Sequence, residues 1–162
     1  LVVQRFRNFL SAMGLDRDAE GCNALHLHTL SQCAFMLPYA EEVCHTLARS
    51  HKLYLVTNAV ASVQRGRLAK SPIVPDITAA FISEEAGAAK PSAAYFDYVF
   101  ARIDGITREN CLVIGDSISS DIRGANNYGL PCCWYNPRHT PRPDGLRIDY
   151  EIDDLRALCD IV

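Results

Sequence analysis

Short apolar runs that alternate with helical stretches are the feature of this 162-residue chain that most limits its fold. The runs are predicted strands at 53–56, 81–82, 111–114 and 132–135, with a last one near 148–152. Apolar residues between them recur at helical spacing. Strands that are apolar along their whole length and alternate with helices indicate a parallel sheet covered on both faces. The sequence therefore predicts an α/β fold built on a parallel sheet.

The beginning of the chain lacks this alternation. Apolar residues recur at helical spacing over 2–13, and Asp16 or Asp18 is placed to cap a second helix. We therefore expect a separate helical layer over residues 1–36 and a single α/β unit over 37–162.

Composition and charge argue against several classes of function. The formal net charge is −3 and no block of Lys or Arg occurs, which argues against a nucleic-acid binder. No apolar stretch approaches the roughly 20 residues that a membrane span needs. The seven cysteines are odd in number and form no Cys-x-x-Cys pair, which favours reduced thiols in a cytoplasmic protein. We therefore expect neither a nucleic-acid polymer nor a membrane as a partner.

Polar side chains follow three of the predicted strands. Thr57 and Asn58 come directly after the first, Lys90 follows the second, and Asp116 and Ser117 follow the third. Each alone has a structural explanation, because Thr, Asn, Asp and Ser cap helices and a Lys-Pro pair is commonly a solvated turn. The carboxyl ends of parallel strands meet at one edge of a sheet, where ligands bind. We therefore expect these side chains to form one site.

The chemistry of these groups suits a phosphate and a metal ion. Hydroxyl and amide groups bind phosphoryl oxygens, and a lysine neutralises the charge that develops on them. Asp116 and Asp121 lie at the end of a strand and in the first turn of the next helix, so both can face one Mg²⁺ ion. Lys90 is one of only three lysines against thirteen arginines, which is consistent with a need for a compact point charge.

Three segments resemble motifs of one known family. The sequences LYLVTNA (53–59), ISEEAGAAKPSAAYFDYVF (82–100) and CLVIGDSISSDIRGANNYGL (111–130) are similar in order, spacing and local structure to the second, third and fourth motifs of the haloacid dehalogenase-like (HAD) superfamily. The resemblance covers 37–162, and 1–36 resembles the tail of the helical cap inserted in that superfamily. The branch that looks most similar is that of the bacterial pyrimidine 5′-nucleotidases. The resemblance implies a Rossmann-like parallel sheet with part of a helical cap.

The resemblance also implies a reaction, the hydrolysis of phosphomonoesters through a phospho-aspartate. Thr57 and Asn58 would bind the transferring phosphoryl group, and Lys90 would stabilise its charge and orient the nucleophile. Replacing Lys90 would then lower turnover and leave the melting temperature nearly unchanged. Nucleoside 5′-monophosphates or similar small phosphorylated metabolites would be the substrates.

The same resemblance implies Mg²⁺ as the cofactor. Asp116 would ligate the ion, Asp121 would support it directly or through water, and Ser117 would assist. The substitution Asp116→Ala is therefore expected to abolish turnover, and Asp121→Ala to weaken it less.

The nucleophile motif of the family, Asp-x-Asp-x-Thr after a first apolar strand, is absent from this chain. The one Asp-x-Asp candidate, Asp16 and Asp18, follows the end of a predicted helix and is interpreted as a helix cap. We therefore expect the nucleophile on a missing N-terminal segment, whose strand would lie between the strands 53–56 and 111–114. This chain alone is then expected to be inactive. The open position would be filled by that complementing segment or by self-association, because unpaired strand edges are costly and adhesive.

Three other functions stay open. A dehalogenase of the same superfamily needs no metal and would replace Gly115 and Asp116, which this chain retains. A non-catalytic remnant that binds a ligand or partner would explain the missing nucleophile. A phosphorelay receiver would need an acceptor aspartate at the end of a mid-chain strand, where this sequence has Thr57 and Asn58.

Overall fold

The computed structural model describes residues 3–162, and the chain divides into two compact units. The first unit comprises the residues up to 35 together with 62–71, and the second comprises 36–61 together with 72–162. The candidate phosphate-binding and metal-binding residues named above all belong to the second unit.

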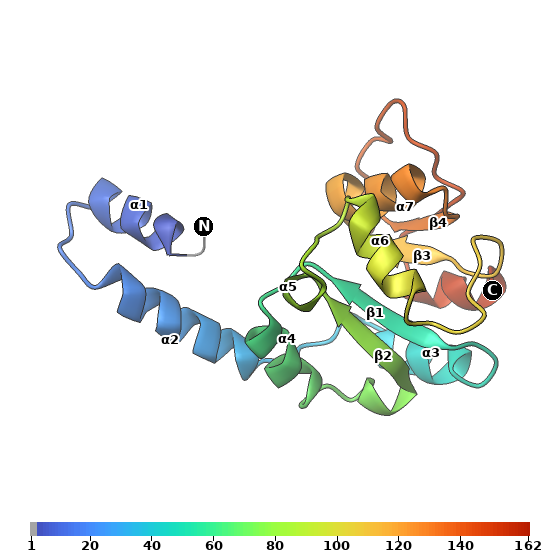
Figure 1. Ribbon diagram of the computed structural model, residues 1–162, viewed down its shortest axis with the longest axis horizontal. Helices are drawn as coiled ribbons and strands as arrows, with labels where there is room; N and C mark the ends of the chain where they lie inside the picture. Colours follow the sequence, from blue (N-terminus) through green and yellow to red (C-terminus); the bar gives the residue numbers. More distant parts are fainter. Residues whose placement is uncertain (1–2) are drawn as a thin grey trace. The chain divides into compact units, whose positions relative to one another are not determined.

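The first unit is helical. It contains α1 (Gln4–Ala12), α2 (Ala19–Ser31) and most of α4 (Ala61–Leu68). Helices α1 and α2 pack against each other (Figure 1), and the ring of Phe6 meets His26 edge-on at a centroid distance of 5.6 Å. Arg67 Nε donates a hydrogen bond to the carbonyl of Cys33 at 3.2 Å. This bond ties α4 to the chain that follows α2.

The second unit contains two parallel sheets. Its strands are β1 (Leu53–Thr57), β2 (Ile77–Ile82), β3 (Val113–Gly115), β4 (Cys132–Tyr135) and β5 (Tyr150–Ile152). One sheet pairs β1 with β2 (Figure 1), and the other has the order β3-β4-β5. Every one of these pairings is parallel. Within residues 3–162, β1 and β3 share no ladder hydrogen bonds.

Helices and turns connect these strands. The α-helices are α3 (Ala40–Leu47), α5 (Ser83–Ala86), α6 (Ala93–Phe100) and α7 (Arg123–Tyr128). A π-helical turn, η2 (Ile118–Ile122), leads directly into α7. The 3₁₀ turns are η1 (Val74–Asp76) and η3 (Leu155–Asp160).

The strand layer lies between two hydrophobic clusters. Helices α6 and α7 contribute to the first cluster, in which Tyr95 is buried beside Trp134 of β4. Helix α3 and the turn η3 contribute to the second, in which Val43 and Leu158 are buried beside Cys133. Strands β1 and β4 supply side chains to both clusters. The predicted α/β fold, with parallel strands covered on both faces, is confirmed.

Several strand boundaries differ from the sequence prediction, and the strand pairing accounts for two of these differences. The strand predicted at 111–114 is observed at Val113–Gly115. Its pairing begins at Val113 because that residue lies opposite Cys132, the first residue of β4. The second strand is longer than the predicted 81–82, because β2 pairs with β1 along the whole length of β1.

Helix length and the state of the cysteines are two further features of the structure. No helix in the part of the chain that the structure describes is long and apolar enough to cross a membrane. All seven cysteines are free thiols. Cys132 and Cys133 are buried, whereas Cys159 is exposed.

Candidate active site

The carboxyl ends of β1 and β3 carry most of the side chains that the sequence singled out. Thr57 is the last residue of β1, and Asp116 follows directly after β3. Lys90 lies just before α6, and Asp121 lies in η2. Lys90 and Asp121 are buried, whereas Asp116 is exposed.

The Lys90 ammonium joins the two strand ends. Its Nζ donates one hydrogen bond to the carbonyl of Val56, in β1, and another to Oδ1 of Asp121, both at 2.6 Å. Lys90 is 8% exposed, so its ion pair with Asp121 is shielded from water. The arrangement holds one positive charge at a fixed place between the end of β1 and the turn after β3.

Asn58 fixes the main chain of Lys90. Its Nδ2 donates to the Lys90 carbonyl at 2.8 Å, and the Lys90 N–H donates to its Oδ1 at 2.9 Å. A side-chain amide has a second N–H to donate, so the expected contact between Asn58 and a phosphoryl group stays a prediction.

The glycine at the end of β3 makes room for Asp121. A Cβ at Gly115 would lie 2.4 Å from Oδ2 of Asp121, closer than two such atoms can approach. That Oδ2 accepts a hydrogen bond from the main-chain N–H of Ser117 at 3.1 Å, while Oδ1 accepts from Lys90. The Ser117 hydroxyl accepts from the main-chain N–H of Ser120 at 3.3 Å and so caps η2. Both oxygens of Asp121 are therefore already hydrogen-bonded.

Asp116 presents a carboxylate that is available to a metal ion. Its main-chain carbonyl accepts a hydrogen bond from Nε1 of Trp134 at 3.2 Å, and within residues 3–162 its carboxylate has no partner. The described residues hold no group of three or more His, Cys, Asp or Glu side chains that could bind a metal by themselves. Mg²⁺ is commonly bound by one or two carboxylates and otherwise by water and substrate phosphate. Asp116 fits this ion as one of its ligands.

The main chain of Thr57 is held from the protein interior. Its N–H donates to the hydroxyl of Tyr95 at 3.0 Å, and that hydroxyl donates to the carbonyl of Phe81 at 2.6 Å. The Thr57 hydroxyl has no partner in the described part of the chain. Sequence patterns indicate only that Tyr95 and Trp134 belong to the core, because the hydrogen-bond partner of a buried aromatic residue leaves no periodic signal.

Asp16 and Asp18 belong to the first unit. Asp18 occupies the N-cap position of α2, and the described chain has no strand before it. The position of Asp18 agrees with the predicted helix cap, but its side chain makes no capping hydrogen bond.

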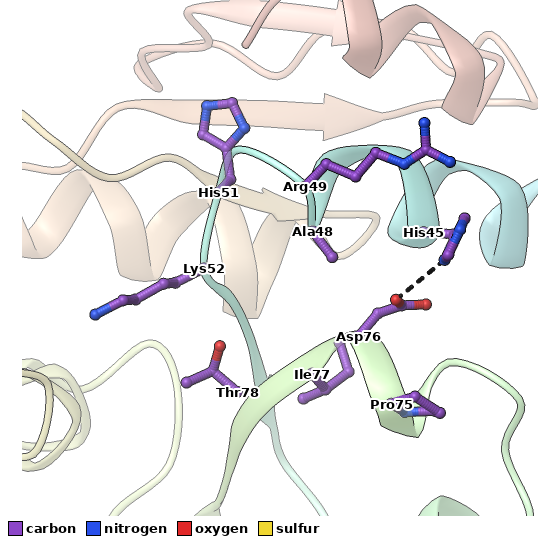
Figure 2. Close-up of a pocket in the computed structure, with 9 residues that line it drawn as sticks. All are labelled: His45, Ala48, Arg49, His51, Lys52, Pro75, Asp76, Ile77 and Thr78. Atoms are coloured by element: carbon purple, nitrogen blue, oxygen red, sulfur yellow. Dashed lines mark hydrogen bonds and ion pairs between the residues drawn. The ribbon is translucent and has the colours of Figure 1, made fainter.

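A separate surface pocket of about 370 Å³ lies at the opposite edge of the strands, where β1 and β2 begin (Figure 2). Basic side chains line it, among them Arg49, His51 and Lys52, together with His45, whose Nδ1 lies 3.3 Å from Oδ1 of Asp76. Figure 2 shows that His51 and Lys52 point away from the His45–Asp76 pair, so these charges do not converge on one point. None of the candidate residues lines this pocket.

Comparison with known sequences gives consistent matches. A family described as HAD-hydrolase-like matches residues 87–158. The pyrimidine 5′-nucleotidase PynA of Streptococcus pneumoniae is 34% identical over 161 residues, which cover 99% of this chain and 68% of that protein. The putative HAD-hydrolase YfnB of Bacillus subtilis is 34% identical over 162 residues, which cover 100% of this chain and 69% of that protein.

Solved structures give the same result. A crystal structure of YfnB bound to magnesium matches with a TM-score of 0.94 at 34% identity, over 99% of this chain and 70% of that chain. A 2-haloacid dehalogenase from Pseudomonas syringae matches with a TM-score of 0.72 at 27% identity, over 99% of this chain and 69% of that chain. The sequence and structure matches therefore agree on one fold.

Proposed function

Because this chain belongs to the haloacid dehalogenase-like (HAD) hydrolase family, as the resemblance of its motifs predicted, we propose that it acts as a Mg²⁺-dependent phosphomonoester hydrolase. We propose nucleoside 5′-monophosphates or similar small phosphorylated metabolites as its substrates, a class supported by the 34% identity to the nucleotidase PynA. The observation that carries the proposal is the buried pair of Lys90 and Asp121, with the unpartnered Thr57 hydroxyl and Asp116 carboxylate at the same strand ends.

In this proposal, Thr57, Asn58 and Lys90 bind the phosphoryl group. The Thr57 hydroxyl and the remaining N–H of Asn58 donate to phosphoryl oxygens. The Lys90 ammonium has three N–H groups and uses two of them on Val56 and Asp121, so one is left to donate to the substrate. Its positive charge opposes the negative charge that develops on the oxygens, and burial reduces the screening of that interaction.

We assign Mg²⁺ to Asp116. The bound ion would supply positive charge next to the phosphoryl oxygens. Asp121 and Ser117 then support the ion indirectly, since the Asp121 oxygens already accept hydrogen bonds from Lys90 and from the Ser117 main chain. The magnesium-bound structure of YfnB, at 34% identity to this chain, supports Mg²⁺ as the ion.

We propose that the attacking carboxylate comes from another segment, which pairs with both β1 and β3. The two carboxylates of the candidate site already have roles, since Asp121 pairs with Lys90 and Asp116 is assigned to the metal. In the described chain β1 pairs only with β2 and β3 only with β4, so one edge of each strand has no ladder partner. All five residues of β1 are partly exposed and Ile114 is 38% exposed, which supports a missing neighbour.

An inserted parallel strand would join the two sheets into one and would deliver a carboxylate to the edge where Lys90 lies. The segment would be a complementing N-terminal strand, with self-association of the chain as the alternative.

The test is phosphate release by the complete protein from a panel of nucleoside 5′-monophosphates, with and without Mg²⁺. Asp116→Asn should remove the Mg²⁺-dependent release and leave the melting temperature unchanged, because this exposed carboxylate has no partner in residues 3–162. Asp104→Asn, at another exposed aspartate, is the matched control and should retain full activity. Unchanged release and unchanged Mg²⁺ dependence in Asp116→Asn would exclude the proposed metal site.

A dehalogenase is the second candidate, favoured by the TM-score of 0.72 and 27% identity to a 2-haloacid dehalogenase. The retained Gly115 and Asp116 argue against it. Chloride release from 2-chloropropionate without Mg²⁺, in the absence of phosphate release, would establish that activity instead. Failure of both assays would leave the non-catalytic binding module as the remaining function.

A cytoplasmic location is part of the proposal and is supported by the seven free thiols.

A further inference from the structure

We propose that the Tyr95 hydroxyl is a positioning group, which holds the main chain of Thr57 in the place where the Thr57 side chain binds phosphate. This inference rests on the proposed function, because it assumes that Thr57 contacts the phosphoryl group. The inference adds to the proposed site a residue of helix α6 that does not itself contact the substrate.

The geometry places the Tyr95 hydroxyl between the ends of β1 and β2. It accepts a hydrogen bond from Thr57 N–H at 3.0 Å and donates one to the Phe81 carbonyl at 2.6 Å. Thr57 is the last residue of β1, and Phe81 is the residue before the end of β2. The hydroxyl therefore joins β1 to β2 at the point where their ladder ends, next to the candidate site.

The Tyr95 side chain is itself fixed. It is fully buried, at 0% exposure, and its ring meets that of Phe96 edge-on at a centroid distance of 5.7 Å. Burial raises the pKa of Tyr95 to about 12, with the charge of Asp121 adding to the shift. The group therefore stays protonated at neutral pH, which it must be in order to donate to the Phe81 carbonyl while it accepts from Thr57.

Removing only the hydroxyl should loosen Thr57. In Tyr95→Phe the Thr57 N–H and the Phe81 carbonyl both lose their partner, so the end of β1 is free to shift. A small displacement of a binding group is enough to lower activity strongly. Phosphate is bound in the ground state as well as in the transition state, so the loss should appear mainly as a higher KM.

A matched control removes a hydroxyl from the same hydrophobic cluster. Tyr128 packs against that cluster, and its ring stacks on Phe96. Its hydroxyl donates a hydrogen bond at 2.8 Å to Oδ1 of Asp97, whose side chain is exposed. Tyr128→Phe therefore makes the same chemical change without touching Thr57.

The experiment compares the complete wild-type protein with Tyr95→Phe and Tyr128→Phe. Each is assayed with p-nitrophenyl phosphate at saturating Mg²⁺, and inhibition by inorganic phosphate and the exchange of the Thr57 amide proton are measured. In Tyr95→Phe we expect kcat/KM to fall about tenfold through KM, phosphate to inhibit more weakly by a similar factor, and Thr57 to lose protection from exchange. Tyr128→Phe should match the wild type in all three.

Equal effects of the two substitutions on KM and on phosphate inhibition would overturn the inference. So would lost protection of Thr57 with unchanged KM, since the hydroxyl would then be structural only. In either case an active wild type would leave the proposed function standing. A wild type that neither hydrolyses phosphomonoesters nor binds phosphate would instead overturn the proposed function, and the inference with it.

Discussion

The Nζ of Lys90 lies 2.6 Å from Oδ1 of Asp121, and the two side chains are 7% and 11% exposed. Through its second bond, to the carbonyl of Val56, the same ammonium connects this pair to β1. Lys90 therefore has two roles, as the charge of the proposed site and as a cross-link between β1 and the turn η2 that follows β3.

Removing the Lys90 charge should lower both activity and stability. Lys90→Met leaves the Asp121 carboxylate buried without its counter-ion, which costs about 3–5 kcal/mol in comparable pairs. The expectation from sequence alone, an unchanged melting temperature, is therefore revised because the pair is buried. We also expect kcat to fall by roughly 10²-fold or more, measured as phosphate release beside thermal unfolding.

The double substitution Lys90→Met, Asp121→Asn separates the two roles. It removes both charges, so most of the lost stability should return while kcat stays low. A double variant with restored kcat would exclude a catalytic role for Lys90. A single variant as stable as the wild type would show that the pair is not buried in solution.

Gly115→Ala should displace Asp121. The new Cβ would overlap the Asp121 carboxyl group, and overpacking of this kind costs about 1–3 kcal/mol. Chemical denaturation measures the loss. The matched control is the same change in an Asp121→Gly background, where the overlapped Cβ and carboxyl atoms are gone and the cost should shrink. Equal costs in both backgrounds would mean that Gly115 is required for another reason.

The cysteines should differ sharply in reactivity. Burial raises the pKa of Cys133 to about 11 and also raises that of Cys132, so little thiolate forms at neutral pH. Iodoacetamide at about pH 8 should therefore modify the exposed Cys159 and spare this buried pair, as read by peptide mass spectrometry. In urea all seven should react. Fast labelling of Cys133 in the folded protein would contradict the burial of β4.

Residues 1–162 alone should release no phosphate and should associate. The open edges of β1 and β3 present unpaired main-chain groups, and such edges pair with other chains. Size-exclusion chromatography with light scattering should show mass rising with concentration. Ile114→Lys places a charge at a 38% exposed position of β3 and should reduce the association. A monomer that hydrolyses nucleoside monophosphates would refute the need for a complementing segment.

The sequence was informative where structure depends on local pattern. All five strands were located from apolar runs, since burial on both faces imposes that composition. The sequence indicated Lys90 as a phosphate-binding residue and Asp121 as a residue that supports the metal ion, and not as partners of each other. Their direct pairing depends on how two distant segments meet, which no local pattern records. The hydrogen bonds of Tyr95 and Trp134 were missed for the same reason, because an aromatic residue at a core position gives the same pattern with or without a polar partner.

The break in the ladder between β1 and β3 also bears on how the second unit unfolds. Side-chain packing and the Lys90 bridge are the links observed between the two sheets in residues 3–162, since no main-chain ladder joins them. The pair β1–β2 can therefore open as a sub-global unit without breaking a hydrogen bond of the β3–β4–β5 ladder. Folding cooperativity across the unit would then depend on the strand that inserts between them, so that its arrival would convert two partly independent foldons into one.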